Sequence, residues 1–261
     1  MLMNLVLPAL AAATLLQGAS PELIEEFDAS TTRTGFVKLL MTPAEVLGEA
    51  AAERLNPILL ATEPVEWRVY VPRDYRPQEP PGILVFVSSI DRGGIPEQWQ
   101  PLMDEHNLIW IGASHAGSSA PVQERVLKSI LAPRAIDRKY KVDTERVYIG
   151  GFADGGMVAN LVQTAEPGVF KGGMYVCGAL FWGDDEPAKL VAIRQNRHVF
   201  IRGCFDPKER EIQRIHAQYK EAGVEDSALI NIPTRRQSLP IARYIADAIR
   251  YLDSEETVLA D

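Results

Sequence analysis

The residues best suited to chemistry lie in the segment Gly151-Phe-Ala-Asp-Gly155, between a short apolar run and a helical pattern. A tight glycine turn between a strand and a helix matches the G-x-S-x-G pattern, in which a strained turn exposes a serine nucleophile for ester or amide hydrolysis. The flanking glycines carry no Cβ, so the strand and the helix can approach closely. Ala153 occupies the serine position. The sequence therefore predicts the turn without the hydroxyl nucleophile.

The surrounding residues extend this pattern over a longer stretch. The segment RVYIGGFADGGMVANLV, residues 146–162, follows Tyr140-Lys-Val-Asp143 and precedes Pro167-Gly-Val-Phe170. It resembles the elbow region of α/β-hydrolases, particularly esterases of the polyhydroxybutyrate-depolymerase and feruloyl-esterase type, with similarity over roughly residues 64–253. The glycine spacing fits neither a dinucleotide-binding nor a P-loop motif, and no cofactor is expected. The resemblance implies the α/β-hydrolase fold, a mostly parallel central sheet with helices on both faces.

The resemblance also implies positions for an acid and a histidine. Asp206 follows an apolar strand pattern where the family carries its acid, although Asp206 before Pro207 also suits a helix N-cap. Gln237 occupies the histidine position, between Pro233 and Pro240. A glutamine amide does not act as a general base near neutral pH. Because the nucleophile and the base are both replaced, the sequence predicts a degenerate triad of Ala153, Asp206 and Gln237.

Other residues could supply chemistry at the same site. Asp154 follows the nucleophile position, where the family uses the backbone amide for the oxyanion hole. Ser88 and Ser89 follow a strand where the family often has a His-Gly pair, and their amides could still form an anion-binding nest. His115 is expected at the same sheet edge as the elbow, although a lone histidine near serines is more often structural.

Three further residues are candidates for lining a pocket. Phe181 and Trp182 follow a predicted strand in a segment that the family uses for its pocket or cap, and simple core packing explains them equally well. Arg236, beside Arg235, flanks the degenerate histidine position. Together with amides at a helix N-terminus, these arginines favour an anionic ligand such as a carboxylate, although paired loop arginines are usually solvated.

The composition limits the class of protein. The chain has 261 residues, a formal net charge of −8 and 46% hydrophobic residues, which is ordinary for a globular protein. This charge argues against nucleic acid as a partner, and no spacing of His, Cys, Asp and Glu resembles a metal site. Three hypotheses remain: a degenerate esterase homologue that binds a small molecule or partner, a hydrolase with an unconventional constellation around His115 or Asp154, and a scaffold protein.

Hydrophobic patterning predicts alternating strands and helices. Strands are expected at residues 64–72, 82–87, 108–114, 146–150, 172–180, 198–203 and 228–232. Helices are expected at residues 42–55, 96–106, 121–139, 157–163, 187–194, 207–222 and 238–252, with an amphipathic pattern in 121–139. Cys177 and Cys204, at the ends of successive strands, are expected to be buried thiols, since neighbouring parallel strands seldom suit a disulfide. The predicted hydrolase domain spans residues 64–261, after an N-terminal extension at 21–63.

The first twenty residues carry no charged side chain, and residues 5–16 form an apolar run. This run is too short to span a bilayer, so no membrane span is predicted, but its length suits a signal peptide. Small residues at Gly18-Ala-Ser20 suit a cleavage site, whereas the lack of a preceding Lys or Arg and Pro21 after the cut do not. A buried helix is the alternative. The segment predicts a secreted or periplasmic protein, or a cytoplasmic one if it is not cleaved.

The protein recovered from its native host is expected to begin near Pro21, because a cleavable segment ends at the preceding small residues. N-terminal sequencing of the purified protein checks this. Retention of Met1 on a cytoplasmic protein would contradict export.

Overall fold

An eight-stranded sheet runs through the described part of the chain, with the order β1-β2-β4-β3-β5-β6-β7-β8. The structure is a computed structural model that describes residues 33–181, 187–203, 209–233 and 239–254. The strands are β1 (Gly35–Met41), β2 (Val65–Val71), β3 (Gly82–Val87), β4 (Leu108–Ala113), β5 (Val147–Phe152), β6 (Gly172–Val176), β7 (Arg197–Gly203) and β8 (Ser227–Ile232). Strand β2 pairs antiparallel with β1 and β4, whereas every pairing among β3 to β8 is parallel.

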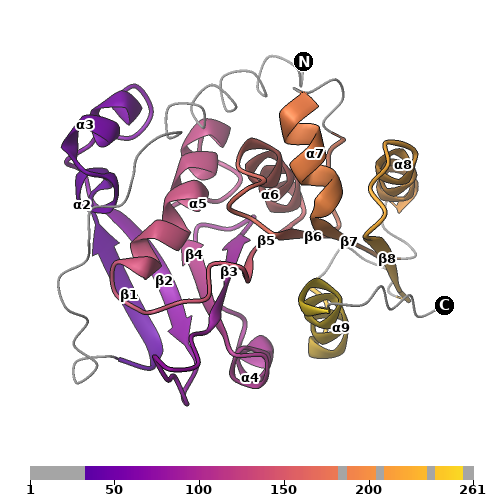
Figure 1. Cartoon of the computed structure of the whole chain (residues 1–261), viewed down its shortest axis with the longest axis horizontal. Coiled ribbons are helices and arrows are strands. Elements are labelled where there is room, and N and C mark those ends of the chain that lie inside the picture. The colour runs from indigo at the N-terminus through magenta and orange to yellow at the C-terminus, as the bar shows by residue number, and fades with distance from the viewer. Residues whose placement is uncertain (1–32, 182–186, 204–208, 234–238, 255–261) are drawn as a thin grey trace.

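Helices cover both faces of the sheet (Figure 1). One face carries α2 (Pro43–Leu47), α3 (Glu49–Ala52), α5 (Val122–Asp137), α6 (Asp154–Ala165), α7 (Pro187–Gln195) and α8 (Glu209–Glu221). The other carries α4 (Gln100–Glu105) and α9 (Ala242–Asp253). A hydrophobic core lies on each side of the sheet. This is the predicted α/β-hydrolase architecture. None of the helices in the described segments is both long and apolar enough to cross a membrane.

The central strands form because their sequences are continuously apolar. All six residues of β3 are buried, as expected for a parallel strand covered by helices on both faces. Strand β1 was not predicted. It lies at the edge of the sheet, where its exposed residues alternate with partly or fully buried ones, and it pairs along its full length with β2. The sheet therefore begins within the segment that was expected to be an N-terminal extension.

The helix predicted for residues 42–55 is correct at its start and wrong in its length. Thr42 and Glu45 form the expected capping box, in which each side chain accepts a hydrogen bond from the other residue's backbone amide. Helix α2 then ends at Gly48, whose φ of 83° is a conformation that favours glycine. Two short helical segments, α3 and a 3₁₀ turn at Glu53–Leu55, follow the break.

Helix α5 lies where a helix was predicted, but it is buried on most of its surface rather than amphipathic. Arg125 and Lys128 are among its buried residues, with exposures of 2% and 7%. Charged side chains are seldom buried unless they are paired. Lys128 forms an ion pair with Glu124 and donates to the carbonyl oxygen of His115. Arg125 forms an ion pair with Asp154, the first residue of α6.

His198, at the start of β7, belongs to a buried polar network. Its Nε2 lies 2.9 Å from the carbonyl oxygen of Ile193 and its Nδ1 lies 3.1 Å from the Tyr175 hydroxyl. A carbonyl can only accept, so Nε2 carries the proton and Tyr175 donates to Nδ1. Burial lowers the pKa of His198 to about 4, although the hydrogen bond to the Ile193 backbone and the negative charge of Asp226 act to raise it. The imidazole is therefore neutral in the folded protein near pH 7.

Acidification is expected to destabilise the fold through His198. Its folded pKa lies below the unfolded value, so its contribution is complete above the unfolded pKa of about 6.5 and is lost as the pH falls toward 4. Between pH 7 and pH 4.5 the loss is on the order of 2 kcal/mol. Urea denaturation of the wild type and His198→Gln measures it, because the variant lacks this part of the pH dependence. His115→Gln, an exposed site, serves as the control. Equal pH slopes in the wild type and His198→Gln would contradict the assignment.

Candidate active site

Ala153 lies at the turn between β5 and α6, with φ 56° and ψ −120°. These angles are close to those of the first central residue of a type II′ turn, a position that strongly favours glycine. Backbone hydrogen bonds fix the turn: the Ala153 amide donates to the Val176 carbonyl at 2.8 Å, and Gly156 donates to the Ala153 carbonyl at 3.1 Å. The strained elbow geometry predicted from the sequence is therefore present, with a methyl group at its tip.

Glycines around Ala153 allow the backbone to pack at van der Waals contact. A Cβ on Gly155 would overlap the carbonyl oxygen of Val87 at the end of β3. A Cβ on Gly156 would overlap the carbonyl oxygen of Gly178, and one on Gly178 would overlap that of Ala153. These contacts leave the turn no room to relax. The surrounding structure thus holds Ala153 in its unfavourable conformation.

The side chain of Asp154 is held in a polar network beneath the elbow. Its Oδ2 lies 2.6 Å from Nη1 of Arg125, and its Oδ1 lies 3.0 Å from the Ser118 hydroxyl. Arg125 also donates to the carbonyl oxygens of Ala116 and Ser88 at 2.9 and 3.0 Å. Asp154 therefore positions the loops around the elbow. Arg125 and Ser118 were not among the residues predicted for the site, because only the fold brings them to Asp154.

The loop after β3 contacts the same network. Ser88 Oγ accepts a hydrogen bond from the Ile90 amide at 3.1 Å. The Ser89 carbonyl accepts a hydrogen bond from the Ser118 amide and lies 2.8 Å from the Ser118 hydroxyl. The serine side chains thus shape the loop. The Gly156 amide donates to the Ala153 carbonyl, whereas the first two amides of α6, those of Asp154 and Gly155, precede any acceptor within the helix and remain as donors for an anion at this end of the sheet.

All four histidines of the chain fall within the described residues, and only His115 lies at the carboxyl edge of the sheet where the elbow is. His106 precedes β4, His198 starts β7, and His216 lies on α8. Strand β3 separates β4 from β5, so the strand ends carrying His115 and Ala153 are roughly 10 Å apart. The geometry does not place His115 within hydrogen-bond reach of the nucleophile position.

Serine and histidine side chains form no catalytic pair in the described part of the chain. The rings of His198 and His216 contact a tyrosine hydroxyl and backbone carbonyls. Ser114, next to His115, donates instead to Glu66 at 2.9 Å. His115 itself is exposed, has a φ of 51°, and lines a separate cavity. Among these segments, no group of three or more His, Cys, Asp and Glu side chains could hold a metal ion.

Phe181 is partly buried against the core on the α6 face, where its ring packs edge-to-face on Tyr219 with centroids 6.0 Å apart. This contact fits the core-packing interpretation of Phe181. The remaining sequence candidates, Asp206, Gln237, Trp182, Arg235, Arg236 and the thiol Cys204, lie outside the described residues. Strands β7 and β8 end at Gly203 and Ile232, at the same edge as the elbow. Convergence of Asp206 and Gln237 on Ala153 stays a prediction.

No protein-family model and no curated protein matches the chain. Solved structures do match it. S-formylglutathione hydrolase from Staphylococcus aureus is 12% identical with a TM-score of 0.61, and the match covers 85% of this chain and 99% of that enzyme. A serine-to-alanine mutant of an α/β-hydrolase enzyme from the metagenome of Lake Arreo, Spain, is 13% identical with a TM-score of 0.58, over 92% of this chain and 85% of that one.

A thermostable esterase is 15% identical with a TM-score of 0.55 over 83% of this chain, and the match covers only 62% of that enzyme. This chain therefore spans less than two thirds of the esterase's length. Identities this low define the fold alone. The chain has the α/β-hydrolase fold, and its structural neighbours include esterases.

Replacement of Ala153 by glycine is expected to raise the free energy of unfolding by about 1 kcal/mol. The positive φ costs a residue with a Cβ about 1–3 kcal/mol, and glycine removes this strain. The greater conformational entropy of glycine in the unfolded state offsets about 0.5–1 kcal/mol of that gain. The matched control is Ala159→Gly, in the middle of α6, which is expected to lower stability by about 1 kcal/mol or more. Urea denaturation measures both. Equal losses in the two variants would mean that the elbow is unstrained.

Proposed function

We propose that this chain is a catalytically inactive, esterase-like α/β-hydrolase homologue that binds a small molecule or a partner in the remnant pocket at its elbow. The observation that supports it is the backbone of Ala153, which keeps a strained φ of 56° without a nucleophile to present. Strain of this kind persists where the surrounding structure imposes it, and it is concentrated at functional sites. An elbow without its serine still offers first-turn amides to an anion.

Loss of catalysis is the better interpretation because two positions have changed together. A serine nucleophile needs a base to activate it, and the sequence has Gln237 where that base is expected. A hydrolase built around Asp154 or His115 is less well supported. The Asp154 carboxylate pairs with Arg125, and His115 lies two strands away in the sheet order.

We also propose that the mature protein is exported, on the basis of the apolar segment at residues 5–16. A thermal-shift screen separates binding from a purely structural role, because a ligand that binds only the folded state raises its stability.

Restoration of the triad is expected to require two substitutions at once. Wild type, Ala153→Ser and Gln237→His are each expected to hydrolyse short-chain chromogenic esters at background rates, because a serine without a base is a weak nucleophile. The double variant Ala153→Ser/Gln237→His is expected to show measurable turnover, with Asp206 orienting the imidazole. The gain should be small, since loss of an oxyanion donor alone slows a reaction by about 100- to 1,000-fold and the Ser88 loop lacks the usual sequence.

Adding Asp206→Asn to the double variant is the matched control, and it should return turnover to background. Ester hydrolysis by the unmodified protein at a rate that Ala153→Gly and Gln237→Ala leave unchanged would contradict the proposal. The chemistry would then lie around His115.

A further inference from the structure

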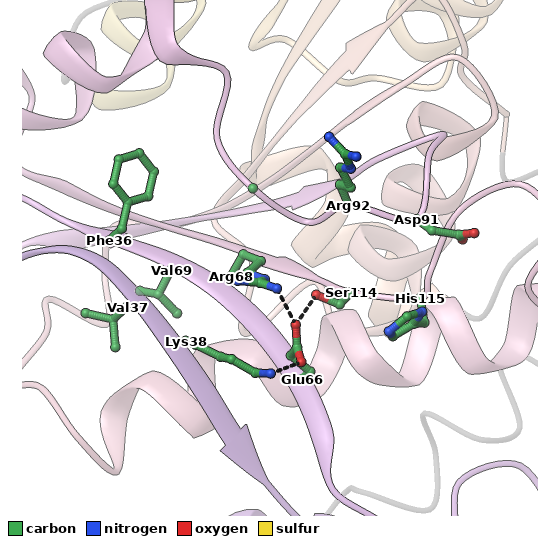
Figure 2. Close-up of a pocket in the computed structure, with 11 residues that line it drawn as sticks. Phe36, Val37, Lys38, Glu66, Arg68, Val69, Asp91, Arg92, Ser114 and His115 are labelled. Atoms are coloured by element: carbon green, nitrogen blue, oxygen red, sulfur yellow. Dashed lines mark hydrogen bonds and ion pairs between the residues drawn. The ribbon is translucent and has the colours of Figure 1, made fainter.

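A cavity of about 570 Å³ lies between the strand pair β1–β2 and the loop after β3, at the side of His115. Figure 2 shows Phe36 at one side of it, Arg92 and His115 at the other, and the cluster around Glu66 between them. Its volume is within the range of small-molecule sites, about 300–1,000 Å³. Ala153 and Asp154 do not line it, so it is distinct from the elbow.

The cavity lining carries three cationic side chains, Lys38, Arg68 and Arg92, against the two carboxylates Glu66 and Asp91, although the chain as a whole carries a net charge of −8. Lys38 and Arg68 are direct cross-strand partners on β1 and β2, a placement of like charges that destabilises a sheet. Glu66 offsets it, with oxygens 2.5 Å from Lys38 Nζ and 3.0 Å from Arg68 Nη2. The Lys38 hydrogen bond, with help from Ser114 and Arg68, holds the pKa of Glu66 below its usual value. A single ionised carboxylate thus serves two cations.

Arg92 is a third cation at the cavity, and it is exposed. It forms no ion pair within the described segments. Its loop is held in place: the carbonyl of Asp91 accepts from the His115 amide at 2.9 Å, and the carbonyl of Gly93 accepts from Trp110 Nε1 at 3.0 Å. The Asp91 carboxylate accepts from the Gly117 amide at 3.0 Å and points away from the Glu66 cluster in Figure 2. The cavity therefore presents an exposed arginine on a loop whose backbone is held in place.

The opposite side of the cavity is apolar. Phe36 is 66% exposed, an unusual position for an aromatic ring, and its partner across β2 is Tyr70. Tyr70 packs edge-to-face against Phe36 with ring centroids 5.4 Å apart, which orients the Phe36 ring. A molecule in the cavity would thus meet a fixed aromatic ring at one end and cationic side chains at the other.

We propose that this cavity binds a small aromatic carboxylate. The guanidinium groups of Arg92 and Arg68 supply paired N–H donors that match the two oxygens of a carboxylate. The aromatic ring of the ligand packs on Phe36, where it covers apolar surface now exposed to water. His115 also lines the cavity and offers a further ring nitrogen to the acid. The proposal does not depend on the elbow or on the state of the triad.

Calorimetric titration of the full-length protein with benzoate, phenylacetate and 3-phenylpropionate tests this site. At least one acid is expected to bind, and its neutral amide is expected to bind at least about tenfold more weakly, because the arginines then lose their charged acceptor. Arg92→Gln and Arg68→Gln are each expected to weaken binding by at least about tenfold. Phe36→Ala is expected to weaken it severalfold. All three side chains are largely exposed, so the variants should keep the wild-type melting temperature.

Arg214→Gln is the matched control, because it removes the same charge from the exposed surface of α8, outside the cavity lining. It should leave the affinity unchanged. Equal binding of an acid and its amide, equal affinity in Arg92→Gln and Arg214→Gln, or no heat with any of the acids would overturn the proposal. Inorganic phosphate that binds as tightly as the acids would also overturn it, since the ring would then contribute nothing.

Discussion

Close backbone packing at one point of the sheet determines the architecture of the elbow. The ends of β3, β5 and β6 meet the start of α6 there, and Gly155, Gly156 and Gly178 leave no space for a Cβ. The strain at Ala153, about 1–3 kcal/mol, is outweighed by the burial of α6, because each buried aliphatic side chain such as Val158 contributes about 1.5–3 kcal/mol. The turn can therefore persist with alanine at its tip.

The ion pair between Arg125 and Asp154 extends this constraint to the neighbouring loops. Arg125 is 2% exposed and reaches three backbone or side-chain oxygens, including that of Ser88. Removing one partner of a buried pair leaves an uncompensated charge, which is strongly destabilising. The carboxylate next to the nucleophile position thus has a structural role that does not require catalysis. The fold therefore depends on the side chain of Asp154. At the neighbouring position, Ala153, a methyl group is sufficient to form the turn.

The sequence predicted the continuous parallel strands well, since runs such as residues 82–87 are apolar throughout and their flanking turns are clear. It did not reveal β1, where the alternating pattern of an edge strand is weak. It also suggested an exposed face for α5, because the partners of the buried charges on this helix are brought to it only by the fold. The elbow was predictable because its residues are contiguous. The cavity was not, because β1, β2, the loop after β3 and the end of β4 are separated in sequence.

A hydrolase fold that keeps the shape of its catalytic turn has, on this account, lost the groups that act there. Intact-mass spectrometry after treatment with a fluorophosphonate tests this most directly, because the reagent modifies serines that are activated as nucleophiles. A catalytically inactive elbow predicts that the mass of the wild-type protein stays unchanged. A single phosphonyl adduct on any serine, such as Ser114 or Ser118 beside His115, would contradict it.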